Sequence, residues 1–141
     1  MKDRKITKAL ARLNVYELNS FRRFLLSPYF NQNEAFVVFF DLLNGAIRAD
    51  KDPGSIDSKD VWTKIYGPDT PYNDVKFRKL SSDFFALFEE FIMQKELESD
   101  GSEKLRLLMK AYINRNLSEL YGSLIHHIEC NKKLHQSKNA E

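Results

Sequence analysis

Apolar residues recur at helical spacing along most of the chain, three and four positions apart. The pattern predicts about six helices and no clear strand. The most regular segment runs from Asp74 to about Leu97, and its apolar face consists of Phe77, Leu80, Phe84, Leu87, Phe88 and Phe91. We therefore expect an all-α fold in a single domain over residues 1–141, either a helical bundle or the start of a helical-repeat array.

Two helices are predicted before residue 30. The first is short, and its apolar side chains are Ile6, Leu10 and Leu13. The second runs from about Val15 to Leu26 behind Asn14, a residue type that caps helix N-termini. Its predicted buried face consists of Val15, Leu18, Phe21 and Leu25. Pro28 ends this helix, because proline has no N–H with which to continue it.

A third helix is predicted after Asn33, the expected cap. Apolar residues cover all sides of it between Phe36 and Ile47. A helix without a polar face must be covered on several sides, so we place it at the centre of the bundle. A buried strand over Ala35 to Phe40 is the alternative, because this run is β-branched and aromatic.

Residues 51–55 form the best predicted linker, because Pro53 and Gly54 favour a turn and disfavour a helix. A domain boundary there would divide the chain into sub-units over residues 1–50 and 56–135.

Four further helices complete the prediction. A short one carries Val61, Trp62 and Ile65 and ends at Gly67. The long helix follows, with Asn73 as its expected cap. After a break at residues 100–102, two helices joined by a short turn at 114–116 form an antiparallel hairpin that ends near Leu134. The apolar side chains of this hairpin are Leu105, Leu108, Ala111, Tyr112, Leu117, Leu120, Tyr121, Leu124 and Ile128.

Composition excludes several protein classes. The 141 residues are 43% apolar and include 11 phenylalanines, six tyrosines and one tryptophan, which argues against disorder. The formal charge of +2 argues against a uniformly charged nucleic-acid coat. Cys130 is the only cysteine, the N-terminus lacks the apolar stretch of a secretory signal, and no apolar run is long enough to span a membrane. We therefore expect a cytoplasmic protein.

Candidate catalytic and metal-binding residues are few. The only cluster of metal-ligand types comprises His126, His127, Glu129, Cys130 and His135. His126 and Cys130 share a helix face, but that face lies almost opposite the apolar stripe, so a solvated or covered polar face is the preferred interpretation over a metal site. The chain has no phosphate-binding glycine loop, nucleophile elbow or zinc helix motif. We expect no enzymatic activity, no catalytic residues, no cofactor and no metal.

Charge is distributed unevenly. Residues 1–25 carry seven basic and two acidic side chains, whereas residues 51–100 carry seven basic and eleven acidic ones. The basic N-terminal segment could dock on phosphates, on an anionic membrane surface or on the acidic face of its own domain, and we favour the last.

Residues 58–91 resemble a helix-turn-helix, although the turn from Tyr66 to Asn73 is longer than usual and Asp74 and Asp83 would repel phosphates. Nucleic-acid binding is therefore the alternative function. The residues expected to contact nucleic acid are Arg22, Arg23, Lys76, Arg78 and Lys79.

Three short segments are similar to a known family. They are Ser27-Pro28-Tyr29-Phe30-Asn31, Pro71-Tyr72-Asn73-Asp74, and Arg78 to Asp83 leading to Glu90-Phe91. They resemble uncharacterised helical proteins of Bacteroidetes bacteria, over about Leu18 to Leu120. The resemblance implies a cytosolic, wholly helical protein of which this chain is the N-terminal part, and it implies no catalytic residues.

The sequence thus favours a non-enzymatic helical module for protein–protein interaction or scaffolding. The aromatic surplus, the uneven charge and the lack of a catalytic constellation support this interpretation. Tyr29, Tyr72 and Arg78 are the candidate partner-binding residues. The expected partner is another protein or a further C-terminal part of a longer chain.

Overall fold

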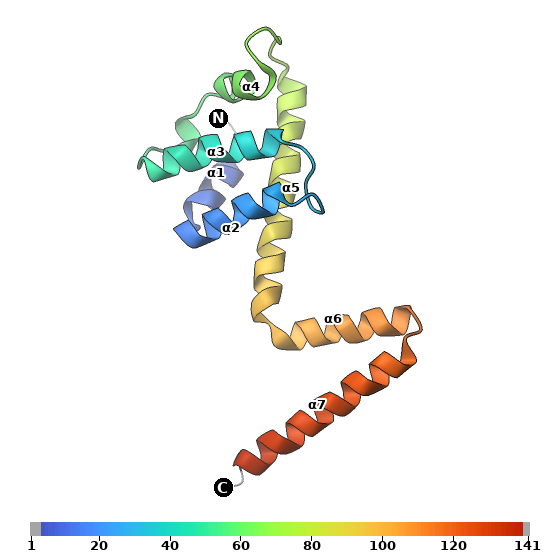
Figure 1. Ribbon diagram of the computed structural model, residues 1–141. Helices are drawn as coiled ribbons and strands as arrows, with labels where there is room; N and C mark the ends of the chain where they lie inside the picture. Colours follow the sequence, from blue (N-terminus) through green and yellow to red (C-terminus); the bar gives the residue numbers. More distant parts are fainter. Residues whose placement is uncertain (1–3, 140–141) are drawn as a thin grey trace. The chain divides into compact units, whose positions relative to one another are not determined.

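The computed structural model describes residues 4–139, which form seven α-helices and one short 3-10 helix (Figure 1). The elements are α1 (Arg4–Ala11), α2 (Val15–Leu26), α3 (Ala35–Arg48), η1 (Pro53–Ser55), α4 (Ser58–Tyr66), α5 (Asp74–Ser99), α6 (Gly101–Asn114) and α7 (Ser118–Asn139). No strand occurs among these residues, so the all-α prediction is confirmed and the strand over Ala35 to Phe40 is not formed. The chain divides into two units, residues 1–93 and 94–141.

Local sequence explains the start of α2. Asn14 Oδ1 accepts a hydrogen bond from the Glu17 backbone N–H at 2.9 Å, and Glu17 Oε1 accepts one from the Asn14 backbone N–H at 3.1 Å. These reciprocal bonds form a capping box, which satisfies two amides that the helix itself leaves unpaired. Leu18, Phe21 and Leu25 are buried as predicted. Val15 is 55% exposed, so its predicted place on the buried face is wrong.

Val15 is the first residue of α2, and its side chain belongs neither to the core nor to the apolar side chains packed against the core. Apolar periodicity assigns it to the stripe, but coverage by another element decides whether a side chain on the stripe is buried.

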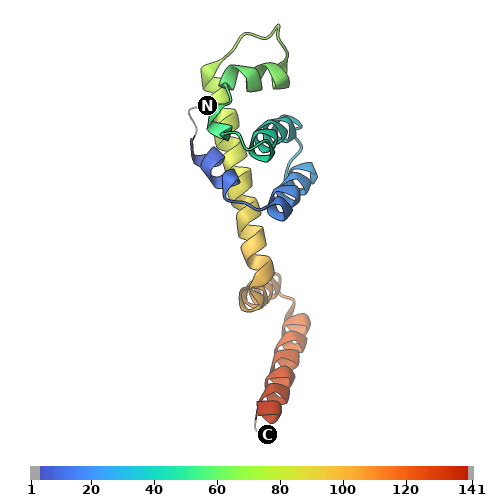
Figure 2. The ribbon, with the colours of Figure 1, turned by 90° about the vertical axis from the view of Figure 1, so that its left-hand side faces the viewer.

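The first unit has an aromatic core around Phe21 of α2. Its ring centroid lies 5.4 Å from that of Phe40 on α3 and 5.1 to 5.7 Å from those of three α5 side chains, Phe84, Phe88 and Phe91. Helix α3 packs against α1, α2, α4 and η1, as its predicted central place requires. Figures 1 and 2 show α1 to α4 alongside the N-terminal part of α5.

Both the weakest predicted helix and the predicted linker contribute to this core. Ile6 and Leu10 of α1 are completely buried. Pro53 of η1 is also buried, and η1 contacts α1 and α3. Residues 51–55 therefore lie inside the first unit.

The turn between α4 and α5 is held by specific bonds. Gly67 ends α4 with φ 86°, a conformation that favours glycine. The Trp62 indole N–H donates to the Thr70 carbonyl at 2.9 Å, and Asn73 Oδ1 accepts from the Lys76 backbone N–H at 3.1 Å. Asn73 is thus the cap of α5 that the sequence predicted.

The second unit contains the end of α5 together with α6 and α7. Asp100 caps α6 by accepting from the Glu103 backbone N–H at 3.0 Å, and Asn116 in the turn before α7 has φ 56°. The two helices contact each other next to this turn and diverge beyond it (Figures 1 and 2). Helix α7 continues to Asn139, past the predicted end at Leu134.

Candidate functional site

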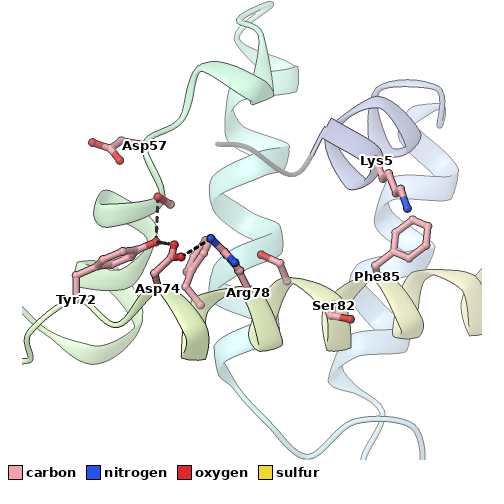
Figure 3. Close-up of a pocket in the computed structure, with 10 residues that line it drawn as sticks. Lys5, Asp57, Tyr72, Asp74, Arg78, Ser82 and Phe85 are labelled. Atoms are coloured by element: carbon pink, nitrogen blue, oxygen red, sulfur yellow. Dashed lines mark hydrogen bonds and ion pairs between the residues drawn. The ribbon is translucent and has the colours of Figure 1, made fainter.

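A cavity of about 720 Å³ lies in the first unit, and we name it the Tyr72 cavity. It is bordered by the start of α1, the start of α4, the turn before α5 and the first three turns of α5 (Figure 3). Its lining includes Lys5, Ser58, Tyr72, Arg78, Ser81 and Phe85. The volume lies in the range typical of small-molecule sites, and the lining combines apolar rings with polar groups.

One hydrogen-bonded network joins Tyr72 to Arg78. The Tyr72 hydroxyl donates to Asp74 Oδ1 at 3.2 Å and lies 3.4 Å from Ser58 Oγ. The Arg78 guanidinium pairs with Asp74 Oδ2 at 2.7 Å. The Tyr72 ring packs against Trp62 at 5.6 Å between centroids. Two of the three predicted partner-binding residues are therefore neighbours in one site, linked by Asp74.

Ser81 is the unusual residue of the cavity. It lies on the buried face of α5, is only 4% exposed, and its Oγ has no hydrogen-bond partner among the described residues. A buried hydroxyl is normally paired, because an unpaired one loses its hydration without compensation. Sequence reasoning missed Ser81, yet a signal existed: it follows Phe77 by four positions and precedes Phe84 by three, so a polar residue occupies a core position.

Tyr29, the third predicted partner-binding residue, belongs to a different cluster. It lies in the turn after α2, is 90% exposed, and contacts the Phe30 ring at 5.1 Å between centroids. Phe30 in turn stacks on Phe24 at 4.4 Å. Tyr29 is therefore a solvent-facing ring on a packed aromatic support.

The basic N-terminal helix faces acidic residues of its own unit. A second cavity, of about 760 Å³, is lined by Lys5 and Lys8 of α1 and by Glu89 and Glu90 of α5. Docking of the basic segment on the acidic face of its own domain stays a prediction. Lys2 and Asp3 lie outside the described residues.

The five predicted nucleic-acid contacts are mostly engaged within the chain. Three pair with acids: Arg22 with Asp41 at 2.9 Å, Arg78 with Asp74, and Lys79 with Asp83 at 3.4 Å. The hydrogen bond and the charge of Asp41 raise the pKa of Arg22.

The other two contact uncharged groups. Arg23 donates to Ser20 Oγ at 3.3 Å, and Lys76 lies 4.6 Å from the Tyr66 ring centroid. Lys76, Arg78 and Lys79 share α5, whereas Arg22 and Arg23 lie on α2. The five residues therefore come from two helices, and each already has a partner in this chain.

Among the side chains that the structure describes, His126, His127 and Cys130 of α7 do not assemble a metal centre. Cys130 Sγ lies 3.7 Å from His126 Nε2, and His127 Nε2 lies 3.3 Å from Asn131 Nδ2. No group of three metal-ligand side chains occurs among the described residues. The side chain of His135 lies outside the described residues.

The second unit presents an apolar surface. None of its side chains between residues 94 and 134 is buried. Large apolar side chains 37% to 62% exposed on α6, on α7 and in the turn between them are Leu105, Leu107, Leu108, Ile113, Leu117, Leu120 and Leu134. Four of them continue the two predicted stripes, and we name these the hairpin leucines: Leu105, Leu108, Leu117 and Leu120.

No protein-family model matches the chain, and neither a curated protein nor a solved structure is significantly similar to it. The resemblance to helical Bacteroidetes proteins therefore stays a prediction. Within the part of the chain that the structure describes, no helix has the length and apolar character needed to cross a bilayer.

Proposed function

We propose that this chain is a non-enzymatic helical module for protein–protein interaction, and that the hairpin leucines contact the partner. The observation that carries the proposal is the exposure of these four aliphatic side chains at 37% to 50% on α6, on α7 and in the turn between them. Exposed apolar patches on helices are typical of interaction sites, because covering them removes apolar surface from water.

The partner surface that fits is the aliphatic face of another helix. Leu105 and Leu108 are three positions apart on α6, and Leu117, directly before α7, is three positions from Leu120 on α7, so each pair forms a ridge that a facing helix can receive. Residues 94–141 carry eight basic and seven acidic side chains, so their net charge is close to zero. Electrostatic repulsion therefore does not keep a partner helix away from this segment. The facing helix belongs to a second copy, to another protein or to a longer form of this chain.

Paired variants test this proposal. Leu108→Ser with Leu120→Ser removes two hairpin leucines, and Leu26→Ser with Val75→Ser removes two apolar side chains of the first unit that are more exposed than these leucines. Circular dichroism verifies that both variants fold. Sedimentation velocity over a wide concentration range then measures self-association, and cross-linking with mass spectrometry measures binding of other proteins in native lysate, with and without nuclease.

We expect association that the hairpin variant loses and the first-unit control keeps. Loss of dimer identifies a second copy as the partner, and loss of a defined cross-linked protein identifies another chain. Association that both variants keep, or none at all, contradicts the proposal. Nuclease-sensitive material that both variants retain would support the nucleic-acid alternative instead.

Tyr29 supplies a second contact in this proposal. Its ring contacts Phe30 but is 90% exposed to solvent. Tyr29→Ala should therefore weaken partner binding without changing the unfolding free energy. Tyr72→Ala removes packing against Trp62 and should lower stability as well. Unchanged partner binding by Tyr29→Ala would remove this tyrosine from the proposed surface.

A further inference from the structure

The Tyr72 cavity has features of a ligand site that are independent of the proposed protein contact on the second unit. Lys5 and Phe85 lie at one end of it, and Tyr72, Asp74 and Arg78 lie at the other (Figure 3). Phe77 and Phe85 supply apolar walls, and Ser81 and Ser82 supply hydroxyls from α5. A small molecule could therefore meet apolar rings and polar groups at the same time.

The charged groups that line the cavity are Lys5, Asp57, Asp74 and Arg78. Both acids already have partners within the chain. Asp74 accepts a hydrogen bond from Tyr72 and pairs with Arg78, and Asp57 accepts one from the Lys59 backbone N–H at 3.1 Å. A guanidinium has five N–H donors, so Arg78 keeps donors after pairing with Asp74. Lys5 adds a second cation to the lining.

Helices α4 and α5 both begin at the cavity, at Ser58 and Asp74. Asp57 already caps α4 by accepting from the Lys59 backbone N–H, and Asn73 caps α5 by accepting from the Lys76 backbone N–H. The Arg78 guanidinium is therefore the group that favours an anionic ligand. Tyr72 donates a hydrogen bond to the Asp74 carboxylate and fixes its position. The fixed carboxylate then orients the Arg78 guanidinium through their ion pair.

Ser81 supplies the independent sign of a ligand. Its side chain lines the cavity, is nine-tenths buried and lacks a hydrogen-bond partner among the described residues. A serine at this position is unfavourable for folding alone, because alanine would fill the same place on α5 without an unpaired hydroxyl. A polar atom of a bound molecule would give Ser81 its partner.

We propose that the Tyr72 cavity binds a small organic carboxylate with an apolar body, whose carboxylate accepts hydrogen bonds from Arg78 and from the Ser81 hydroxyl while its apolar body packs on Phe77 and Phe85. Charge-assisted hydrogen bonds from a guanidinium to a carboxylate are among the stronger polar contacts in proteins. The apolar walls distinguish such a molecule from a simple inorganic anion.

Ligand binding can be measured through the fluorescence of Trp62. It is the only tryptophan of the chain and packs against Tyr72, so its fluorescence reports on the cavity. The probe is cyclohexanecarboxylate, which does not absorb where tryptophan is excited. Cyclohexylmethanol lacks the charge and acetate lacks the apolar body, so these two compounds are the controls. Titration calorimetry on the full chain gives the stoichiometry and the Kd.

Two variants and a matched control assign the contacts. Arg78→Gln should weaken binding about tenfold or more. Ser81→Ala should weaken binding about fivefold while it raises the midpoint of thermal unfolding, because the unpaired buried hydroxyl is gone. Lys79→Gln removes a neighbouring cation that also pairs with an aspartate on α5 but does not line the cavity, and it should bind like the natural sequence.

The proposal requires saturable binding of the carboxylate with a stoichiometry of one and weaker binding of both controls. It is overturned if cyclohexanecarboxylate gives no saturable response, or if cyclohexylmethanol binds equally well. Equal losses in Arg78→Gln and Lys79→Gln would also overturn it, because they would indicate a general charge effect. None of these results depends on the hairpin leucines, so the two proposals fail separately.

Discussion

The two units of this protein use apolar residues in opposite ways. Residues 1–93 contain all sixteen buried apolar side chains of the core, with Phe21, Phe39, Phe40 and Phe84 completely covered. Residues 94–134 contain no buried side chain, although α6 and α7 carry regular apolar stripes. The difference shows that an amphipathic stripe specifies a helix and a face, whereas a folded core also requires elements that cover the face.

The largest expected contrast comes from removing one aromatic ring in each unit. Phe84→Ala removes a fully buried ring that lies 4.7 Å from Phe39 and 5.7 Å from Phe21, and it should cost about 3 to 5 kcal/mol of unfolding free energy. Tyr121→Ala, at a half-buried position of α7, should cost less than about 1 kcal/mol. Urea denaturation measures both. Similar costs would mean that the second unit has a core of its own.

Glycine substitutions should have opposite signs in the two units. Gly67→Ala forces an alanine to φ 86° and should destabilise the first unit by about 1 to 3 kcal/mol. Gly122→Ala lies inside α7 with open space around the added carbon, and it should favour the helix by about 0.5 to 1 kcal/mol. Thermal unfolding and helix content by circular dichroism test the two signs. A stabilising Gly67→Ala would contradict the turn geometry.

Helix caps offer a smaller contrast of the same kind. Asn14→Ala breaks the capping box of α2, whose helix carries core residues, and should lower global stability by about 1 kcal/mol. Asp100→Ala removes the cap of α6 and should lower only local helix content, because no α6 side chain is buried. Denaturation curves and amide hydrogen exchange distinguish these effects. A global loss in Asp100→Ala would show that α6 supports the whole fold.

The smallest expected effect is a pH dependence of α6. Glu103 is hydrogen-bonded to Arg106, which lowers the pKa of the Glu103 carboxyl. A lowered pKa in the folded state means that the helix is favoured above the ordinary glutamate pKa and loses this contribution as pH falls through the lowered value. We expect helix content to decrease slightly in acid, less so in Glu103→Gln and in high salt. An equal acid response in Glu103→Gln would assign the effect to other groups.

Much of the fold was predictable because its causes are local. Asn14, Asn73 and Gly67 act on backbone groups within a few residues, and these are the residues that begin or end helices in the structure. The apolar stripe of α5 was also predictable, because helical spacing alone places Phe77, Phe84 and Phe91 on one face.

The candidate site was predictable only in part. Tyr72 and Arg78 were identified from the sequence, but for their residue types and not for the cavity that they line. The network through Asp74 follows from short spacing along the chain. Lys5 could not be assigned to the same site, because its place beside α5 depends on how α1 packs.

Sequence alone therefore determined the helices, most of their ends and the apolar stripe of each, because these depend on dihedral preferences and on hydrogen bonds between near neighbours. Tertiary structure decided which faces are covered. It buried Ile6 and Leu10 of the weakest helix, left Val15 and the hairpin leucines exposed, and brought Lys5 to the Tyr72 cavity. The reason is that burial and cavities require contacts between segments far apart in the chain, and periodicity carries no information about those partners.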